Sequence, residues 1–401
     1  MKILTFSTLY PNAARPGHAL FVETRLRELV ASGRVEAKVV APVPWFASSN
    51  PFFGEYAQHA RAPKAEMRNG LEVLHPRYPV LPKIGMNVAP YLLYRALAPM
   101  MKRLLERYAF DLIDAHYFYP DGVAAVLLGR AVGRPVVVTA RGTDINLIAR
   151  HALPRRMIRW AARNAAGVIT VSQALKARLQ TLGVPGEGLQ VLRNGVDLER
   201  FRPVDRASVR QRLGLQEKTL LSVGNLLLFK GHHLAIRALS SLPECELVVI
   251  GAGPDRPELE ALAHTSGAAR RVRFTGAIGQ DELRDYYGAA DALILASSRE
   301  GWPNVLLEAM ACGTPVIANA VGGTPEIVTS PDAGLLVRER SAAALAGAVR
   351  QLFARYPDRG ATRRHAERFS WAATTHGQLQ LFNRVVAARA TPGEVRAVSA
   401  R

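Results

Sequence analysis

Short apolar runs alternate with amphipathic stretches along most of the chain. Runs such as KILTFS, FDLIDAHY and RPVVVTARG predict buried strands in the first half, and residues 21–32 have the spacing of a helix. Six further runs, from TLLSVGN to GLLV, repeat the alternation in the second half. Because strands that alternate with helices are typical of parallel sheets, the pattern predicts an α/β protein with two Rossmann-like domains.

The rhythm of the pattern changes in residues 194–203, NGVDLERFRP. Asn-Gly marks a turn and a proline follows before a new alternation begins, so we place the domain boundary here. We expect an N-terminal domain over residues 1–200 and a C-terminal domain over residues 201–375. Residues 376–390 are predicted to form a helix that packs back on the N-terminal domain, and residues 391–401 a frayed tail.

Composition narrows the class of protein further. Of the 401 residues, 49% are hydrophobic and 21% charged, as in a globular rather than a disordered chain. No apolar run reaches the ~18 residues of a membrane span, and the N-terminus lacks the pattern of a signal peptide. We therefore expect a cytoplasmic protein. The two cysteines, Cys245 and Cys312, stand in apolar segments and are expected in the core rather than in a disulfide or metal site.

The charge is strongly basic and uneven. The net charge is +19, and the first two hundred residues hold 27 Lys and Arg against 14 Asp and Glu, a net of +13. Arg155, Arg159 and Arg163 recur every fourth residue and so share one predicted helix face, with no acidic residue between Asp144 and Glu187. Such a surplus indicates an anionic partner, which could be nucleic acid, an acidic membrane or a phosphorylated substrate.

The segment 82–107 is apolar, aromatic and basic, and prolines at 82, 90 and 99 interrupt it. It could form amphipathic helices at a membrane interface or an ordinary helical insertion packed in the core, because apolar periodicity does not distinguish lipid from protein. The first alternative, together with the arginine face, would place the protein peripherally on the inner face of the cytoplasmic membrane.

The largest group of candidate site residues lies in SREGWPNVLLEAMACGTPV, from Ser298 onward. An apolar run ends just before it, and a helix is predicted from Asn304, so Glu300 falls in the loop and Glu308 about one turn inside the helix. Ligands of open parallel sheets bind at this edge, where free N–H groups of a helix N-terminus can hold a phosphate. Taken alone, two glutamates with seven residues between them also fit a solvated helix surface.

A long loop, TLYPNAARPGHALF, follows the first strand and contains Gly17. A loop of this length at the carboxyl edge of a sheet favours a binding role, although Gly17 could serve only the turn.

Together these motifs resemble the retaining family 4 glycosyltransferases of GT-B fold. The likeness runs from Lys2 to about Ala387, and its carriers are the Gly17 loop, DAHYFYPDG, VITVSQALKARL, RNGVDLERF, VGNLLLFKGHH, VIGAGP and the glutamate motif extended to EIV. The resemblance implies two Rossmann-like domains that face a deep interdomain cleft. It also implies sugar transfer, with retention, from a UDP or GDP sugar to a glycan or lipid-linked acceptor in cell-envelope or exopolysaccharide synthesis.

The resemblance assigns roles to individual residues. Glu300 would meet hydroxyls of the transferred sugar, Glu308 the ribose, and Lys230 the diphosphate, where a fixed cation stabilises the leaving group. His116 would hydrogen-bond a sugar hydroxyl, so the catalytic group is His116, Glu300 and Lys230. The expected donor-binding set is Gly17, Asn225, Lys230, Gly253, Ile278, Glu300, Gly301, Asn304, Val305, Leu306 and Glu308. The candidates on the acceptor side are Asp121, Arg141, Thr143 and Asp144.

The chain departs from the family pattern at Asn225, where many members carry an arginine that pairs with the lysine. Asparagine supplies a hydrogen bond but no charge, so another cation is needed, and Arg141 is one candidate. The chain has no Asp-x-Asp motif and no convincing metal spacing among its histidines, so we expect no metal cofactor. Two other hypotheses stay open: a sugar-nucleotide epimerase of the same fold, and a basic nucleic-acid-binding protein, for which no binding module is visible.

Overall fold

The computed structural model describes residues 1–50, 52, 54–81, 85–216 and 218–390. The chain divides into two compact units. Unit 1 comprises Met1–Leu192 together with the stretch from Ala372 to the C-terminus, and unit 2 comprises Arg193–Trp371. The tail expected at 391–401 and the proline at 82 lie outside the described residues.

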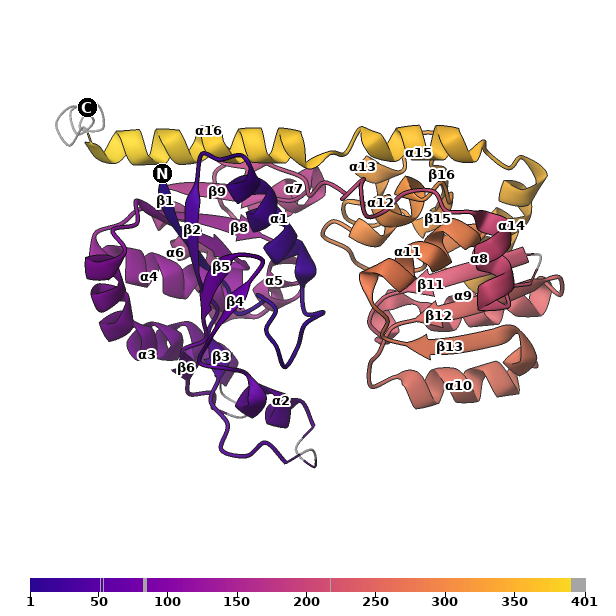
Figure 1. Ribbon diagram of the computed structural model, residues 1–401, viewed down its shortest axis with the longest axis horizontal. Helices are drawn as coiled ribbons and strands as arrows, with labels where there is room; N and C mark the ends of the chain where they lie inside the picture. Colours follow the sequence, from indigo (N-terminus) through magenta and orange to yellow (C-terminus); the bar gives the residue numbers. More distant parts are fainter. Residues whose placement is uncertain (51, 53, 82–84, 217, 391–401) are drawn as a thin grey trace. The chain divides into compact units, whose positions relative to one another are not determined.

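Unit 1 is built on an eight-stranded sheet with strand order β10-β9-β8-β7-β1-β2-β5-β4 (Figure 1). All pairings are parallel except that of β4 with β5. A two-stranded parallel pair, β3 and β6, lies outside it. The strands are β1 (Lys2–Phe6), β2 (Glu36–Val40), β3 (Val43–Pro44), β4 (Ala65–Arg68), β5 (Leu71–Leu74), β6 (Arg77–Tyr78), β7 (Leu112–His116), β8 (Val136–Ala140), β9 (Gly167–Thr170) and β10 (Leu189–Val191).

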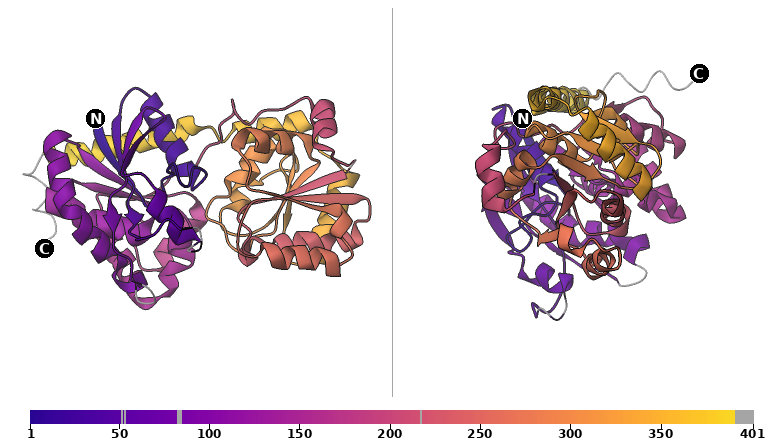
Figure 2. Two further views of the ribbon diagram at one scale, coloured as in Figure 1. Left: turned by 60° about the horizontal axis from the view of Figure 1, so that its bottom comes forward. Right: turned by 90° about the vertical axis from the view of Figure 1, so that its right-hand side faces the viewer.

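Helices connect these strands and cover both faces of the sheet (Figure 2). The apolar cluster on one face joins α1 and α16 to the central strands, through Val22, Leu26 and Phe382 among others. The helical elements of unit 1 are α1 (Leu20–Ala31), α2 (Glu55–Arg61), α3 (Gly85–Arg107), the single turn η2 (Phe118–Gly122), α4 (Val123–Val132), α5 (Thr143–Asn146), η3 (Ile148–Arg150), α6 (Ala152–Asn164), α7 (Gln173–Thr181) and α16 (Trp371–Ala390).

Unit 2 is a second, fully parallel sheet of six strands, with order β13-β12-β11-β14-β15-β16. Its strands are β11 (Lys218–Val223), β12 (Cys245–Ile250), β13 (Val272–Gly276), β14 (Ala292–Leu295), β15 (Val316–Asn319) and β16 (Gly334–Val337). Each of the six overlaps one of the six apolar runs of the second half, and the two Rossmann-like units predicted from the pattern are confirmed.

Two groups of helices pack around the unit 2 sheet. Helices α9, α10 and α14 share one apolar cluster with the strands, whereas α8, α11, α12 and α15 contact one another in a second group. Cys245 and Cys312 are both buried and free, as expected of core residues. The helical elements of unit 2 are α8 (Arg206–Leu213), η4 (Leu228–Lys230), α9 (His232–Ala238), η5 (Leu239–Ser241), α10 (Arg256–Thr265), η6 (Ala269–Arg271), α11 (Gln280–Ala289), α12 (Asn304–Ala311), α13 (Thr324–Ile327), α14 (Ala342–Ala354) and α15 (Arg359–Glu367).

The two stretches of chain that lead out of unit 2 lie side by side. The N–H of Val196 donates to the carbonyl of Phe369 at 2.9 Å. A Cβ on Gly195 would lie 2.5 Å from the backbone nitrogen of Trp371, so only glycine fits there. The chain therefore leaves unit 2 at both ends from one place, and α16 begins there.

Helix α3 corrects the prediction that prolines interrupt the 82–107 segment. It runs without a break from Gly85 to Arg107 through Pro90 and Pro99. Its apolar stripe is buried and the helix packs on α4, which offsets the hydrogen bonds that the prolines remove. The stripe therefore faces protein core rather than lipid. Among the described residues, no helix combines the length and apolar character needed to cross a bilayer.

Candidate active site

Two loops meet at the carboxyl edge of the unit 2 sheet. The loop after β11 ends in the turn η4 at Lys230, and the loop after β14 carries Glu300. The Lys230 ammonium lies 2.8 Å from Oε1 of Glu300, with the two side chains 22% and 9% exposed. The N–H of Ser298 donates to the carbonyl of Phe229 at 2.8 Å and ties the loops together. Two residues that are 70 positions apart in sequence thus form one charged pair.

Glycines allow these loops to approach so closely. Gly231 has a φ of +79°, and a Cβ on it would lie 2.1 Å from the carbonyl oxygen of Ala296. A Cβ on Gly253 would lie 2.3 Å from the carbonyl oxygen of Leu226. Neither position tolerates a side chain, so Gly253 shapes the loop after β11 from the neighbouring strand.

The helix α12 begins at Asn304, as predicted, directly after the Glu300 loop. The indole N–H of Trp302 donates to the carbonyl of Asn194 at 3.0 Å, and the amide of Asn194 donates to Oδ1 of Asn304 at 3.3 Å. The N–H of Leu306 is already donated to the carbonyl of Pro303 at 3.1 Å. Of the three N–H groups expected to face a ligand, those of Asn304 and Val305 therefore stand ahead of the first hydrogen bond of the helix.

Glu308 lies one turn further along α12 and is partly buried. Its Oε2 accepts a hydrogen bond from the Tyr287 hydroxyl at 3.0 Å, and burial raises the pKa of the carboxyl to about 7. Tyr287 comes from α11 and is itself fully buried. Glu308 is thus held in place by a neighbouring helix and is close to its titration midpoint at neutral pH.

Asn225 and Ile278 lie at the same edge of unit 2. Asn225 follows β11 and is exposed, while its carbonyl accepts a hydrogen bond from Nε2 of His232 at 3.2 Å. Ile278 lies between β13 and α11, and Gly301 lies between Glu300 and α12. The carboxyl edge of one sheet therefore brings together the predicted residues of the second half.

A surface hollow of about 510 Å³ adjoins the Lys230 and Glu300 loops. Two cations lie near the ring of Phe229 there: the Arg299 guanidinium carbon is 3.9 Å from the ring centroid and the Lys230 ammonium 5.5 Å. Nε of Arg340 donates to the carbonyl of Ala296 at 2.9 Å and braces the loop. The hollow is lined by Leu227, Leu228, Phe229, Asp255, Ser298, Arg299 and Arg340.

In unit 1, His116 ends β7 and is completely buried. Its Nε2 lies 3.1 Å from Oδ2 of Asp114, and its Nδ1 lies 2.5 Å from a guanidinium nitrogen of Arg141. Burial, reinforced by the Arg141 charge and opposed by Asp114, lowers the pKa of His116 to about 4. Both ring nitrogens are engaged inside unit 1, so a hydrogen bond from this ring to a sugar hydroxyl would require one of these contacts to open.

The two predicted acceptor-side carboxylates hold loops of unit 1 in place. Asp121 accepts hydrogen bonds from the N–H of Thr8 at 2.7 Å and from its hydroxyl at 2.9 Å, and burial raises the Asp121 pKa to about 7. Asp144 accepts from the N–H groups of Phe118 and Gly142, both at 2.7 Å. The two side chains position the loops after β1, β7 and β8.

Thr143 and Gly17 are the exposed members of the unit 1 set. Thr143 begins α5. Gly17 has no positive φ, and nothing lies within 4 Å of where its Cβ would be. The turn therefore does not require glycine at this position.

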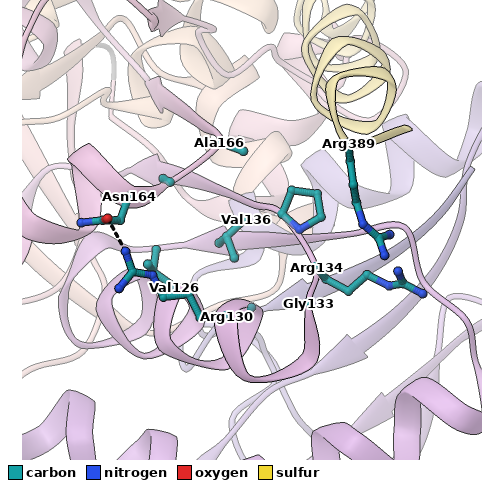
Figure 3. A pocket seen from close by; sticks show the side chains of 11 residues that line it. Val126, Arg130, Gly133, Arg134, Val136, Asn164, Ala166 and Arg389 are labelled. Atoms are coloured by element: carbon teal, nitrogen blue, oxygen red, sulfur yellow. Dashed lines mark hydrogen bonds between the residues drawn. The ribbon is translucent and has the colours of Figure 1, made fainter. Parts of the chain in front are cut away.

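A second hollow, of about 360 Å³, lies at the opposite edge of the unit 1 sheet, where β8 and β9 begin (Figure 3). Arg130 bonds Asn164 there, and Arg134 and Arg389 lie side by side. Burial and the nearby charge of Arg389 lower the pKa of Arg134. None of its described lining residues is acidic.

The predicted arginine face lies on α6, as expected, but it is not uniform. Arg155 and Arg163 are exposed and Arg159 is half-buried; Arg163 donates to the carbonyl of Gly183 at 3.4 Å, and Arg159 lies against the same glycine. Two of the three arginines thus have contacts within unit 1.

Solved structures with the same architecture are glycosyltransferases of the GT-B fold. Sucrose-phosphate synthase from Thermosynechococcus elongatus has a TM-score of 0.78 at 23% identity and covers 96% of this chain and 99% of its own. Anabaena HepE in complex with UDP-glucose has a TM-score of 0.71 at 22% identity and covers 98% and 100%.

The sequence comparisons identify the family. Residues 205–369 match Glycosyl transferases group 1, and residues 54–200 match Glycosyltransferase Family 4. TuaC of Bacillus subtilis, a glycosyltransferase assigned to teichuronic acid biosynthesis, is 30% identical over 357 residues, which are 87% of this chain and 88% of TuaC. A D-inositol 3-phosphate glycosyltransferase of Xylanimonas cellulosilytica is 30% identical over 82% of this chain and 86% of its own. The chain belongs to the family 4 glycosyltransferases.

The structure adds three residues that the motifs did not single out. Tyr287 donates a hydrogen bond to Glu308, and Arg299 precedes Glu300 within the glutamate motif, but the sequence assigns no role to either side chain. Asp114 could have been found, because Asp114 and His116 are two apart in a strand and so point to the same face.

Proposed function

We propose that this glycosyltransferase moves a sugar from a nucleoside diphosphate sugar to a glycan or lipid-linked acceptor with retention of anomeric configuration. The observation that carries the proposal is the Lys230–Glu300 pair at the carboxyl edge of the unit 2 sheet, beside the N-terminus of α12. A cation for a diphosphate, a carboxylate for sugar hydroxyls and free N–H groups for phosphate oxygens all belong to this edge.

Charge on the leaving group is the main demand of the reaction. As the bond from the anomeric carbon to the diphosphate oxygen breaks, the electron pair stays on the diphosphate, and Lys230 with the N–H groups of Asn304 and Val305 would stabilise it. Arg299, on the same aromatic ring as Lys230, is our candidate for the second cation that Asn225 does not supply. We propose that no metal is required, and transfer unchanged by EDTA would support this.

For the chemical step we favour attack from the face that the diphosphate leaves. The acceptor oxygen forms the new bond to the anomeric carbon, and its proton passes to an oxygen of the departing phosphate. Glu300 then orients the sugar through its hydroxyls and forms no covalent bond. Mass spectrometry that trapped a glycosyl adduct on Glu300 would contradict this mechanism and favour a two-step displacement.

The names of related proteins guide the choice of substrates. TuaC is assigned to teichuronic acid biosynthesis, HepE was solved with UDP-glucose, and a Mycolicibacterium smegmatis relative, 31% identical over 70% of this chain, is GDP-mannose-dependent. We propose a role in cell-envelope or exopolysaccharide synthesis with a UDP or GDP sugar. The test is a hydrolysis screen with UDP-glucose, UDP-GlcNAc and GDP-mannose that measures released UDP or GDP. Epimerised UDP-GlcNAc without acceptor would instead favour the epimerase.

We also propose that the basic face of unit 1 binds an anionic membrane surface and so brings the enzyme to a lipid-linked acceptor. Arg155 and Arg163 are its exposed members, and the support is the net charge of +13 in the first two hundred residues. Sedimentation with phosphatidylglycerol vesicles tests this. Binding that survives charge reversal at Arg155, Arg159 and Arg163 would contradict the assignment to this face.

A further inference from the structure

The C-terminal helix α16 places the side chain of Gln378 in the interior of unit 1. Gln378 is 1% exposed, next to the apolar residues Leu379 and Phe382. A buried amide is costly unless its groups are hydrogen-bonded. Directly before it, a Cβ on Gly377 would lie 2.5 Å from Leu192, so glycine lets the helix come close enough to seat Gln378.

Gln378 belongs to a chain of five buried polar side chains that includes the predicted catalytic histidine. Nε of Arg25 donates to Oε1 of Gln378 at 3.0 Å, and Nε2 of Gln378 donates to Oδ2 of Asp114 at 3.0 Å. The same Oδ2 lies 3.1 Å from Nε2 of His116, whose Nδ1 faces Arg141. All five side chains belong to residues no more than 9% exposed.

The direction of each hydrogen bond follows from the two arginines, Arg25 and Arg141, at the ends of this chain of side chains. A guanidinium only donates, so Arg25 fixes the carbonyl oxygen of Gln378 toward itself and the NH₂ toward Asp114. For the same reason Arg141 requires a bare Nδ1 on His116, which leaves the proton on Nε2 to be donated to Asp114. Both ends therefore specify one arrangement, with Asp114 as the common acceptor.

The charges among these five side chains support the same arrangement. Burial opposes ionisation of Asp114, but His116, Arg25 and Arg141 together hold its pKa below the usual range. An ionised Asp114 accepts from both neighbours. A second proton on His116 would point at the guanidinium of Arg141, so the ring stays neutral at neutral pH.

We propose that Gln378 is a positioning residue of the active site: through Asp114 it holds His116 as the Nε2–H tautomer, and that ring in turn holds the guanidinium of Arg141. The inference rests on the proposed sugar transfer, and on the roles that the family resemblance predicts for His116 at a sugar hydroxyl and for Arg141 on the acceptor side. In this proposal α16 positions His116 for catalysis, and it also covers the sheet of unit 1.

The experiment compares Gln378→Glu and Gln378→Met with the exposed control Gln380→Met on the same helix. In Gln378→Glu the side chain still accepts from Arg25 but sets a second carboxylate against Asp114. Gln378→Met keeps the volume and removes both hydrogen bonds, and it carries the test if the first variant does not fold. The ¹⁵N NMR signals of the histidine rings, assigned with His116→Asn, report the tautomer and charge of His116.

We expect both Gln378 variants to change the tautomer or protonation of His116. Turnover of the nucleotide sugar selected by the screen should fall about tenfold to a hundredfold, as when a reacting group is displaced by up to ~1 Å. UDP or GDP affinity should stay within about twofold, because unit 2 carries the proposed nucleotide site. Gln380→Met should change none of these.

Two results would overturn the proposal, and they differ. An unchanged His116 ring spectrum in both Gln378 variants would show that α16 does not set the tautomer, and would leave the proposed sugar transfer untouched. A changed spectrum with normal turnover would show that His116 and Arg141 have no part in transfer, which refutes the roles that the family resemblance predicts for them.

Discussion

Replacing both members of the Lys230–Glu300 pair tests whether this contact both stabilises unit 2 and serves catalysis. At 2.8 Å and an effective dielectric constant of ~20, the gross attraction is about 6 kcal/mol. Desolvation of the two largely buried side chains offsets most of it. A hydrogen bond between charged groups leaves about 1.5–3 kcal/mol of net stabilisation.

We therefore expect Lys230→Met and Glu300→Gln each to lower the free energy of unfolding by about 1–3 kcal/mol. The double variant should lose about 1.5 kcal/mol less than the sum of the two, because neither side chain is then left without its charged partner. Urea denaturation of the full chain, followed by tryptophan fluorescence, gives all four values. Additive losses within about 0.5 kcal/mol would refute the pairing.

The turnover of the unchanged chain, the two single variants and the double variant should not change in parallel with their free energies of unfolding. Lys230→Met removes the proposed cation from the leaving diphosphate and should lower kcat about 100- to 1000-fold. The double variant regains part of its stability but should stay as slow as Lys230→Met. A double variant that recovered activity along with stability would show that Lys230 is structural only.

Other predictions concern single positions of the site. The affinity for UDP should rise with pH up to about pH 7, by at most about tenfold per pH unit, because the carboxyl of Glu308 ionises in this range and can then accept hydrogen bonds from the ribose hydroxyls. Glu308→Gln should flatten this profile in calorimetric titrations. Gly231→Ala should cost about 1–3 kcal/mol of unfolding free energy, because its φ is +79° and Ala296 blocks the Cβ, whereas Gly17→Ala should cost under about 0.5 kcal/mol in the same denaturation assay. Asn225→Arg should tighten UDP binding up to about fivefold, more at low salt, and a loss of affinity would place the diphosphate elsewhere.

The fold of the central strands could be predicted because they are buried on both faces and so form continuous apolar runs. The two edge strands of unit 1 have no such signal: β4 and β10 are short, and β4 alternates between exposed and partly buried positions. The α3 segment shows a different limit. Its periodicity was compatible with lipid or protein on the apolar side, and only the packed structure shows that α4 covers it.

One part of the candidate site could likewise be predicted from residues adjacent in sequence, whereas another part depends on contacts between distant residues. The Glu300 loop and the start of α12 are neighbours in sequence, so their arrangement follows from a strand, a turn and a helix. The chain around His116 joins Arg25 to Gln378 across 353 positions, and nothing local in either segment predicts that contact. The motif DAHYFYPDG contains Asp114, the partner of Nε2 of His116, but neither Gln378, which holds Asp114, nor Arg141, the partner of Nδ1.

The position of α16 at the end of the chain has a consequence for biosynthesis. A ribosome completes the strands of unit 1 first and residues 372–390 last, with all of unit 2 made in between. At ~5–20 residues per second, the 193–371 stretch takes about 10–35 s. During that time the unit 1 sheet lacks the apolar cover of Leu379 and Phe382. The newly made first half is thus an expected client of chaperones that bind apolar surface, and a circular permutant that begins at Ala372 should depend on them less.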